Sequence, residues 1–506
     1  MATSPVYNLT SFVGGISDFT DKGIAGSGQW SSGLEIRSGD DSLTCKQALV
    51  QEGEGVFEDL VLWFVPAPDG NCYGFGDTGR IYKRTSAGVW TKVYTEPTGK
   101  IKGAALSYRY ISANSYKPYL FWATDTRLNR KEIPGQSNWS DVNASGPGTG
   151  ETYPKNNLMP ADWHYMRVVN QLLLIGNNNK LAAVYIEDGS YTNEAEGNPF
   201  PPSITITTLT NCARGNSATA ALCSAAQVDE QACLYDISTE STASQSEVDW
   251  ISRTNLSFSK VDASIDGEFF LIFADGKIWY SDLYNKQPIC SLPSGATVKP
   301  GGAAIRDNVA LFAVSGAVRT HGDTQVTANG IYGYGRNKNA GTPTLNLEYP
   351  MITDELGGLV NFYDNTTNKQ VLLVGSRVGD SYRVYTISEN TKQVGEYTSL
   401  ILKAPYSEFP GRYRFTHVVM KSGEIPEGAK VELFYRIDLN GDFKQAYFSD
   451  AMEHQNSDCE FTSGTEATWE IGDNASYIEL AVKITPVGND SPQIKDIFIV
   501  LEPEAN

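Results

Sequence analysis

The sequence has few of the residues from which metal and redox sites are built. Only four of its 506 residues are histidine and seven are cysteine. No two histidines stand at metal-ligand spacing, and no Cys-x-x-Cys pair occurs. An odd number of irregularly spaced cysteines predicts free thiols in a reducing cytosol rather than a disulfide framework. We therefore expect no metal, no cofactor and no disulfide.

The chain is also short of positive charge. It has 59 acidic side chains against 40 Lys and Arg, a formal net charge of −19. An acidic surface repels phosphate backbones, so sequence-specific binding of DNA or RNA is not expected. Negative charge is typical of a soluble surface, and it would also suit the wall of a channel that DNA passes without sticking.

Long hydrophobic runs are missing as well. The longest apolar stretches, such as residues 61–65 and 269–274, have the length of a strand and end at Pro, Asp or Gly. They are too short to cross a bilayer, so no membrane span is expected. Residues 1–15 contain no Lys or Arg and no apolar core, which argues against a secretory signal.

Catalytic motifs are absent too. There is no Gly-x-Ser-x-Gly elbow, no phosphate-binding loop and no His-Glu-x-x-His. Acidic residues that could serve as catalysts exist, but most are at predicted turns, where Asp satisfies backbone amides. These candidates are Asp59, Asp77, Asp125, Asp275, Asp354 and Glu355. We expect no enzymatic activity and assign no catalytic, cofactor-binding or metal-binding residue.

What the chain does have is a repeat. It contains 27 Tyr, 9 Trp and 47 Gly, a composition that favours β-structure with tight turns. Three similar stretches place an aromatic residue at Trp279, Tyr332 and Tyr385, a spacing of 53 residues each time. A period of roughly 50 residues with one strand pair per period is typical of a radial β array. The sequence therefore predicts an all-β protein built on a β-propeller of about six (five to seven) blades.

Two intervals depart from this period. Tyr82 and Tyr185 are 103 residues apart, which holds two blades of about 50 residues with a weak hairpin at Arg127-Leu128 between them. Tyr185 and Trp279 are 94 residues apart, which fits either one blade plus an insertion or two short blades. We favour an insertion at about residues 208–248. Its small residues at 217–226 predict a short helix, and the polar residues 238–246 predict an exposed loop.

Segments of different character flank the repeat. Residues 1–52 are interrupted by glycines and predict an extended arm with one strand at 34–37. Such an arm is expected either to complete a sheet elsewhere or to dock onto a neighbouring subunit. Alternating strands at 8–14-residue spacing begin near 395 and predict a β-sandwich. The predicted domains are the arm (1–52), the propeller (53–394) and the sandwich (395–506).

A short acidic motif near the C-terminus has two interpretations. Asp438, Asn440 and Asp442 resemble the start of a calcium loop, but no acid follows at 443–449. Asn440-Gly441 between two strands is the strongest short hairpin signal. We therefore predict a hairpin here and no calcium site.

Several segments resemble parts of bacteriophage tail-associated virion proteins. The resemblance to their start lies in Gly14-Gly15-Ile16-Ser17-Asp18-Phe19, residues 34–38 and residues 42–44. Residues 73–82 resemble their first propeller blade, and residues 397–399, 412–415 and 426–436 resemble their C-terminal sandwich. The segment 208–248 departs from the family pattern.

This resemblance implies a non-enzymatic structural protein of the virion, assembled in the host cytoplasm. A tail nozzle, hub or tail-tip position is implied. The implied partners are other virion proteins, copies of this chain in a ring, and a host-surface glycan or receptor. DNA passage through such a ring is part of the same expectation.

Two other functions stay open. The first is a glycan-binding or glycan-cleaving propeller that acts as a receptor-binding protein. Trp139 and Tyr153, in the Gly/Pro/Asn-rich segment 135–160, would then stack on sugars, although this segment also reads as a solvated connection between blades. The second is a host-encoded scaffold propeller with no viral role.

Overall fold

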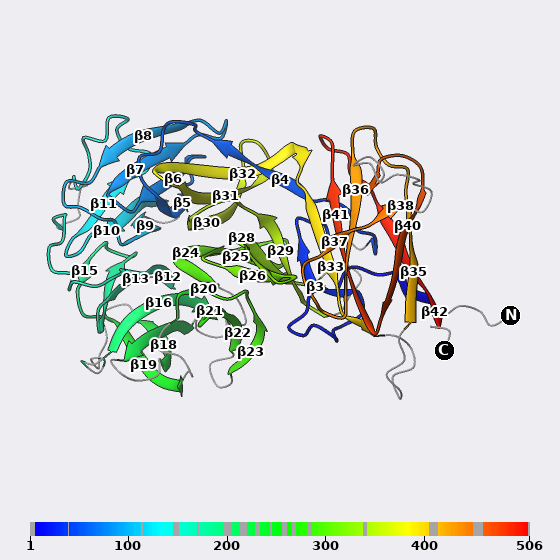
Figure 1. Ribbon diagram of the computed structural model, residues 1–506. Helices are drawn as coiled ribbons and strands as arrows, with labels where there is room; N and C mark the ends of the chain where they lie inside the picture. The colour runs from blue at the N-terminus through cyan, green and yellow to red at the C-terminus, as the bar shows by residue number, and fades with distance from the viewer. Residues whose placement is uncertain are drawn as a thin grey trace.

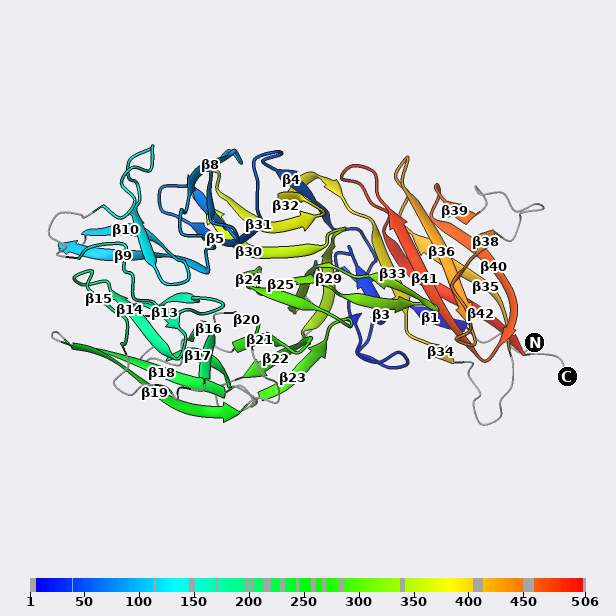
Figure 2. The same cartoon turned by 60° about the vertical axis from the view of Figure 1, so that its left-hand side comes forward.

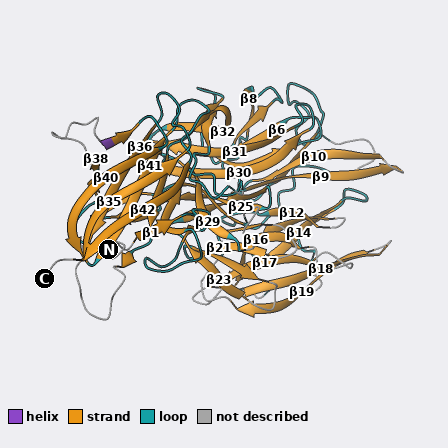
Figure 3. Cartoon of the chain, turned by 90° about the vertical axis from the view of Figure 1, so that its right-hand side faces the viewer, coloured by secondary structure: helices purple, strands orange, loops and turns teal. Residues whose placement is uncertain are grey.

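The computed structural model describes residues 6–38, 40–112, 115–144, 151–169, 172–195, 200, 202, 204–212, 220–227, 233–242, 245–255, 261–265, 270–281, 286–336, 342–403, 413–448 and 459–503. Their regular secondary structure is almost entirely β-strand, and Figure 3 draws one short helical turn beside the sandwich. The predicted all-β class is confirmed. A ring of sheets fills one end of the molecule and a sandwich the other (Figure 1).

Seven blades form the ring in the described part of the chain, and each blade is a sheet of three or four antiparallel strands. Blade 1 consists of β5 (Val61–Pro66), β6 (Cys72–Gly76), β7 (Arg80–Arg84) and β8 (Trp90–Thr95). Blade 2 consists of β9 (Gly103–Ser112), β10 (Ser115–Ala123) and β11 (Leu128–Glu132). Blade 3 consists of β12 (Met166–Val169), β13 (Leu172–Asn177), β14 (Lys180–Tyr185) and β15 (Tyr191–Thr192).

The next blades continue the same order. Blade 4 consists of β16 (Ile204–Cys212), β17 (Ala220–Gln227), β18 (Cys233–Thr242) and β19 (Gln245–Asn255). Blade 5 consists of β20 (Ala263–Ile265), β21 (Phe270–Ala274), β22 (Lys277–Ser281) and β23 (Lys286–Ser291). Blade 6 consists of β24 (Thr297–Arg306), β25 (Val309–Ser315), β28 (Gly330–Gly335) and β29 (Thr344–Pro350). Blade 7 consists of β30 (Glu355–Asp364), β31 (Lys369–Val378), β32 (Ser381–Lys392) and β4 (Gln47–Glu52).

The repeated aromatic residues occupy one position in the fold. Trp279, Tyr332 and Tyr385 lie on β22, β28 and β32, the third strand of blades 5, 6 and 7. Tyr82 and Tyr185 lie on the third strands of blades 1 and 3. The period therefore measures one blade, and the predicted propeller is confirmed.

The expected insertion at 208–248 is wrong. These residues belong to the four strands of blade 4, so the long interval holds two blades. The predicted helix at 217–226 falls largely on β17, and residues 213–219 lie outside the described residues. Small residues carry weak preferences of their own, so pairing with β16 and β18 decides the conformation of this segment.

The N-terminal segment closes the ring. β4 pairs antiparallel with β32 and becomes the outer strand of blade 7, so residues 47–52 belong to the propeller rather than to a separate arm. The strand expected at 34–37 is also wrong, because only a single bridge joins Leu34 to Cys45. The strand of this region is β3 (Ser27–Ser32).

At the centre of the propeller, the inner strands of several blades are in close backbone contact. A Cβ on Gly301 of β24 would lie 2.1 Å from the carbonyl oxygen of Leu62, and one on Gly358 of β30 would lie 2.5 Å from the same oxygen. Only glycine allows strands to approach this closely. The Tyr165 hydroxyl also donates to the Pro300 carbonyl at 3.0 Å, joining blade 3 to blade 6. The strands therefore meet at the axis at this level.

The sandwich packs two sheets around one hydrophobic core. The first sheet runs β1 (Val6–Leu9), β42 (Ile494–Pro503), β35 (Tyr413–Ser422), β40 (Glu466–Ala475) and β38 (Tyr447–Phe448). The second runs β33 (Gly395–Ser399), β41 (Tyr477–Thr485), β36 (Lys430–Ile437) and β37 (Lys444–Gln445), with β34 (Leu402–Lys403) and β39 (Glu460–Phe461) paired beside it.

The second sheet does not end at the domain boundary. β2 (Gly15–Ile16) and β3 lie between β29 of blade 6 and β33 of the sandwich, so blade and sandwich share a single 12-stranded sheet. Figure 2 shows this continuity from β25 and β29 through β3 to β33 and β41. The arm is thus the middle of the connection between the two domains.

Candidate functional site

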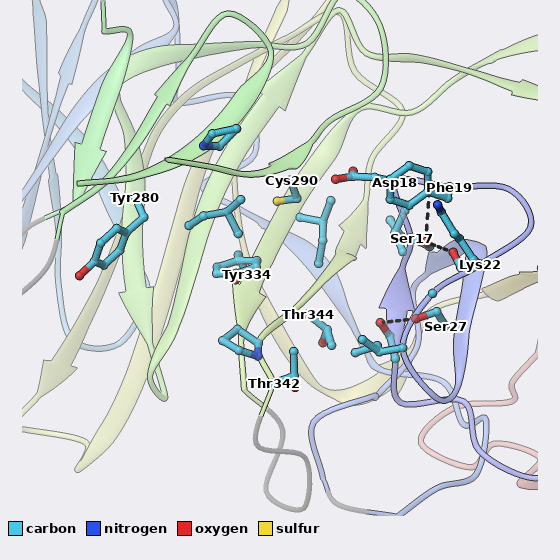
Figure 4. Close-up of a pocket in the computed structure, with 18 of the residues that line it drawn as sticks. Ser17, Asp18, Phe19, Lys22, Ser27, Tyr280, Cys290, Tyr334, Thr342 and Thr344 are labelled. Atoms are coloured by element: carbon cyan, nitrogen blue, oxygen red, sulfur yellow. Dashed lines mark hydrogen bonds between the residues drawn. The ribbon is translucent and has the colours of Figure 1, made fainter. Parts of the chain in front are cut away.

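A surface cleft of about 780 Å³ lies where the arm crosses the propeller. One wall is the arm segment that follows β2, and the opposite wall is the face and outer strand of blade 5 (Figure 4). The floor comes from β28 and the start of β29. The side chains that line this arm cleft most directly are Asp18, Phe19, Lys22, Tyr280, Cys290 and Tyr334.

Local hydrogen bonds hold the arm wall in place. The Ser17 hydroxyl donates to the Lys22 carbonyl at 2.7 Å and accepts from the Phe19 amide at 3.2 Å, which folds residues 17–22 into a loop. Asp18 Oδ1 accepts from the Ser291 amide at 3.0 Å and so ties this loop to the end of β23. The Lys22 ammonium lies 4.4 Å from the centre of the Phe19 ring.

Burial shifts the pKa of two side chains in the arm cleft. Burial, aided by the Asp18 charge, raises the pKa of the Cys290 thiol, so the thiol stays protonated and weakly nucleophilic at neutral pH. Burial, with a contribution from Cys290, raises the pKa of Tyr334 to about 12. No histidine lines the cleft, and its walls are mainly apolar. Among the described residues that line it, no histidine is available as a general base poised near neutral pH.

The candidate acids are mostly engaged in ion pairs and turns. Asp125 pairs with Lys102 at 2.6 Å, and Asp354 accepts from the Gly379 amide at 2.6 Å. Glu355 pairs with Lys299 at 2.6 Å and with Arg377 at 3.0 Å. Asp275 has a positive φ of 52° in the turn between β21 and β22.

Asp59 and Asp77 are candidate acids that the structure brings together, and the charge of a third, Glu355, also acts on Asp77. The fully buried Asp59 accepts from the Tyr82 hydroxyl at 2.7 Å and from the Thr78 hydroxyl at 2.8 Å. Burial, together with the charges of Asp59 and Glu355, raises the pKa of Asp77. Asp77 is the acid on which an acid-to-amide test of the enzymatic alternative should be made.

The aromatic residues expected to stack on sugars are part of the core. Trp139 is 6% exposed and packs against Tyr94 with ring centres 5.9 Å apart. Tyr153 is 5% exposed, and the Arg130 guanidinium lies 4.1 Å from its ring centre. The sugar-stacking interpretation of these two residues is therefore wrong, because both side chains are buried and their rings are not accessible to a sugar.

The acidic motif near the C-terminus forms the predicted hairpin. β36 pairs with β37, and the Asn440-Gly441 turn lies between them. The carboxylates point to protein donors: Asp438 accepts from the Ser476 amide at 2.7 Å, and Asp442 accepts from the Thr324 hydroxyl at 2.9 Å. Among the residues described, no three His, Cys, Asp or Glu side chains are grouped to hold a metal ion.

Comparison with known proteins finds no matching family, and the solved structures that it finds are similar only at a low level. No protein-family model matches the chain, and no curated protein matches it. The extracellular domain of a one component system of B. thetaiotaomicron is 14% identical with a TM-score of 0.42, covering 73% of this chain and 43% of that chain. This chain thus spans less than half of that structure.

Two further solved structures are similar at the same level. Streptogramin B lyase is 11% identical with a TM-score of 0.39, covering 67% of this chain and 97% of that chain. The WD40 β-propeller domain of Doa1 is 12% identical with a TM-score of 0.39, covering 68% of this chain and 98% of that chain. No helix in the described ranges has the length and apolar character needed to cross a membrane.

Proposed function

We propose that this protein is a non-enzymatic structural component of a bacteriophage virion, placed in the tail as a nozzle, hub or tail-tip subunit. The observation that carries the proposal is the single 12-stranded sheet through which arm, propeller and sandwich form one continuous unit. Shared sheet pairing fixes the two domains relative to each other, which suits a part that must keep its shape under load.

The arm cleft supports the same proposal. Its apolar walls and its lack of a poised base suit contact with another protein. Because strands meet at the propeller axis, the DNA path in this proposal runs between copies of the chain in a ring. The acidic surface lets DNA pass such a lumen without adhering.

The test is to purify particles of the phage that encodes this chain and to identify their proteins by mass spectrometry. We expect this chain in a fixed copy number, located by an averaged particle map at the tail. Particles that carry full infectivity without the chain would rule the proposal out.

A glycan-binding receptor protein is the second candidate, and one feature of blade 2 favours it. Tyr108 and Tyr110 on β9 and Tyr116 on β10 are 38%, 38% and 52% exposed. Tyr110 pairs directly with Tyr116, with ring centres 5.6 Å apart, so the rings lie on one face of the hairpin. The hairpin reaches the end of the propeller far from the sandwich (Figure 2). Exposed tyrosine rings are suitable surfaces for stacking on sugars.

A glycan array and a reducing-sugar release assay separate these functions. If the second candidate holds, Tyr110→Ala abolishes glycan binding, whereas the matched control Tyr363→Ala, which removes a 55% exposed tyrosine from blade 7, does not. Sugar release that Asp77→Asn abolishes would establish a glycan-cleaving enzyme and contradict the structural proposal. No binding and no release would leave the virion component as the better account.

A further inference from the structure

A second connection joins the propeller to the sandwich beside the continuous sheet. The hairpin of β26 (Val318–His321) and β27 (Thr324–Thr327) leaves blade 6 between β25 and β28 and reaches the loop that follows β36. Asp442 in that loop accepts from the Asp323 amide at 3.0 Å and from the Thr324 hydroxyl at 2.9 Å. Both hydrogen bonds end on the Asp442 side chain, and in the described residues β26 and β27 form a two-stranded sheet of their own, outside the shared sheet.

One group of side chains lies at the centre of this contact. We call it the junction site; it consists of Trp30, Arg319, His321, Glu396 and Phe443. The His321 and Phe443 rings stack with their centres 4.5 Å apart and 12° between their planes. The Arg319 guanidinium lies 4.4 Å from the centre of the Trp30 ring and pairs with Glu396 at 3.0 Å.

The protonation state of His321 follows from its hydrogen bond. Arg319 Nη1 lies 3.1 Å from His321 Nδ1, and arginine can only donate. Nδ1 must therefore accept, which leaves the single proton of the neutral ring on Nε2. A second proton would have to bind at Nδ1, where it would abolish this hydrogen bond and place a positive charge against a guanidinium.

We propose that His321 is an acid-sensitive switch that releases the β26–β27 hairpin from the sandwich when its ring takes up a second proton. A cavity of about 310 Å³ lies beside the ring and gives the proton a route to it. The shared sheet stays paired, so acidification loosens one of the two connections and leaves the other in place.

Charged side chains of both signs surround His321, and they lie on several different elements. Two cations oppose its protonation, Arg319 on β26 and Arg436 on β36, and two acids favour it, Glu396 on β33 and Asp442 in the loop after β36. Further acids line or border the cavity: Asp18 in the arm, Asp323 in the hairpin turn and Glu479 on β41. Glu479 is already engaged, since it accepts from Arg436 at 2.5 Å.

Burial and the Arg319 charge lower the pKa of His321 below its ordinary value. A histidine with a lower pKa in the closed hairpin than in the released one is protonated preferentially in the released form. The stabilisation of the closed hairpin relative to the released one is therefore complete above about pH 6.5 and decreases as the pH falls below that value. One proton is taken up, so release rises by at most about tenfold per pH unit.

Hydrogen–deuterium exchange of the full-length protein tests the switch. Between pH 7.5 and 5.5, after correction for the intrinsic rate with peptides from β13, we expect protection of residues 318–327 to fall by up to about tenfold. His321→Asn keeps an acceptor near Nδ1 and cannot be protonated, so its protection should change less than about twofold over this range. His417→Asn, which removes a histidine from β35 in the other sheet, should respond as the wild type does.

Two results would overturn the proposal. One is unchanged protection of residues 318–327 in the wild type, and the other is a full pH response in His321→Asn. NMR of the histidine ring signals gives an independent check, because four histidines yield a simple spectrum that single variants assign. A titration midpoint of His321 at or above about 6.5 would also contradict the switch.

Discussion

Two arginine sites connect the arm region to its surroundings, and they differ in burial. In the buried arginine site, which consists of Arg37, Lys46 and Glu348, the Glu348 side chain is 1% exposed. It accepts from Arg37 Nε at 2.9 Å and pairs with Lys46 at 2.5 Å. In the junction site, Glu396 is 43% exposed. The same pairing of arginine with glutamate is therefore isolated from water in one place and hydrated in the other.

This difference in burial indicates which of the two arginine sites stays closed. The Arg37 guanidinium also donates to the carbonyl oxygens of Gly333 and Thr344 at 3.0 and 2.9 Å, so it connects the arm to both β28 and β29. The Arg319 guanidinium donates instead to a ring nitrogen that can itself be protonated. A buried pair with every donor satisfied resists change, whereas a half-exposed contact with a titratable acceptor can be released.

Loss of Glu348 is expected to have the largest effect. Glu348→Ala leaves the buried Arg37 without its counter-charge and Lys46 with only Glu35 at 3.6 Å, so the free energy of unfolding should fall by about 3–5 kcal/mol. Glu396→Ala, the matched change in the junction site, should cost about 1 kcal/mol or less because the pair is hydrated. Urea denaturation of both variants measures the difference. Equal losses would contradict the distinction between the two sites.

Arg37→Lys tests whether shape as well as charge matters in the buried site. Lysine keeps the positive charge but cannot reproduce the fork that reaches Glu348 and the two carbonyl oxygens together. Buried acceptors left without a donor should cost about 1–3 kcal/mol in the free energy of unfolding. Arg319→Lys is the control, and its cost should stay below that of Arg37→Lys when both are measured by the same urea titration.

The buried arginine site and the junction site should also lose stability in different pH ranges. Burial alone would raise the pKa of Glu348, but the charges of Lys46 and Arg37 outweigh it and hold this pKa below the usual range. A lowered pKa in the folded state means that the contribution of Glu348 is complete above its unfolded pKa of about 4.3 and is lost as the pH falls through the folded value.

Urea denaturation of the wild type and Glu348→Gln at pH 7, 5 and 3 measures this contribution as a difference. The difference should stay constant from pH 7 to pH 5 and shrink at pH 3, whereas the junction site responds as the pH falls below about 6.5. A difference that already shrinks between pH 7 and pH 5 would show that Glu348 is not held ionised by its partners.

The propeller is predictable from the sequence because each blade is formed by consecutive residues, so its repeat is visible as a regular spacing along the chain. Trp279, Tyr332 and Tyr385 recur at one interval, and each lies on the third strand of its blade. Blade 4 was missed because residues 220–227 are mostly small, and their weak preferences left the choice of conformation to neighbouring strands. A spacing of 94 residues, nearly twice the period, was the signal that favoured two blades.

The sites depend on contacts between distant parts of the chain, for which a single sequence holds no signal. Arg37 and Glu348 are 311 positions apart, and Gln29 and Glu479 are 450 apart. The arm was predicted to complete a sheet elsewhere or to dock onto a neighbour, and β2, β3 and β4 complete sheets of the same chain. Which sheets they would join was not predictable, because the pairing partners are set by the closed ring.

A small effect, comparable to that of Glu396→Ala, is expected from the aromatic contact in the junction site. Phe443→Leu keeps an apolar side chain but removes the ring that stacks on His321, so the free energy of unfolding should fall by about 0.5–1.5 kcal/mol. Hydrogen exchange of residues 318–327 should rise at pH 7.5 in this variant, because the hairpin loses part of its hold on the sandwich at every pH. Phe448→Leu, which changes a ring that packs on Trp469 inside the sandwich, is the control and should leave exchange of the hairpin unaltered. If Phe443→Leu destabilised the protein as much as Glu348→Ala, the junction site would be part of the permanent core, and the contrast between the two arginine sites would fail.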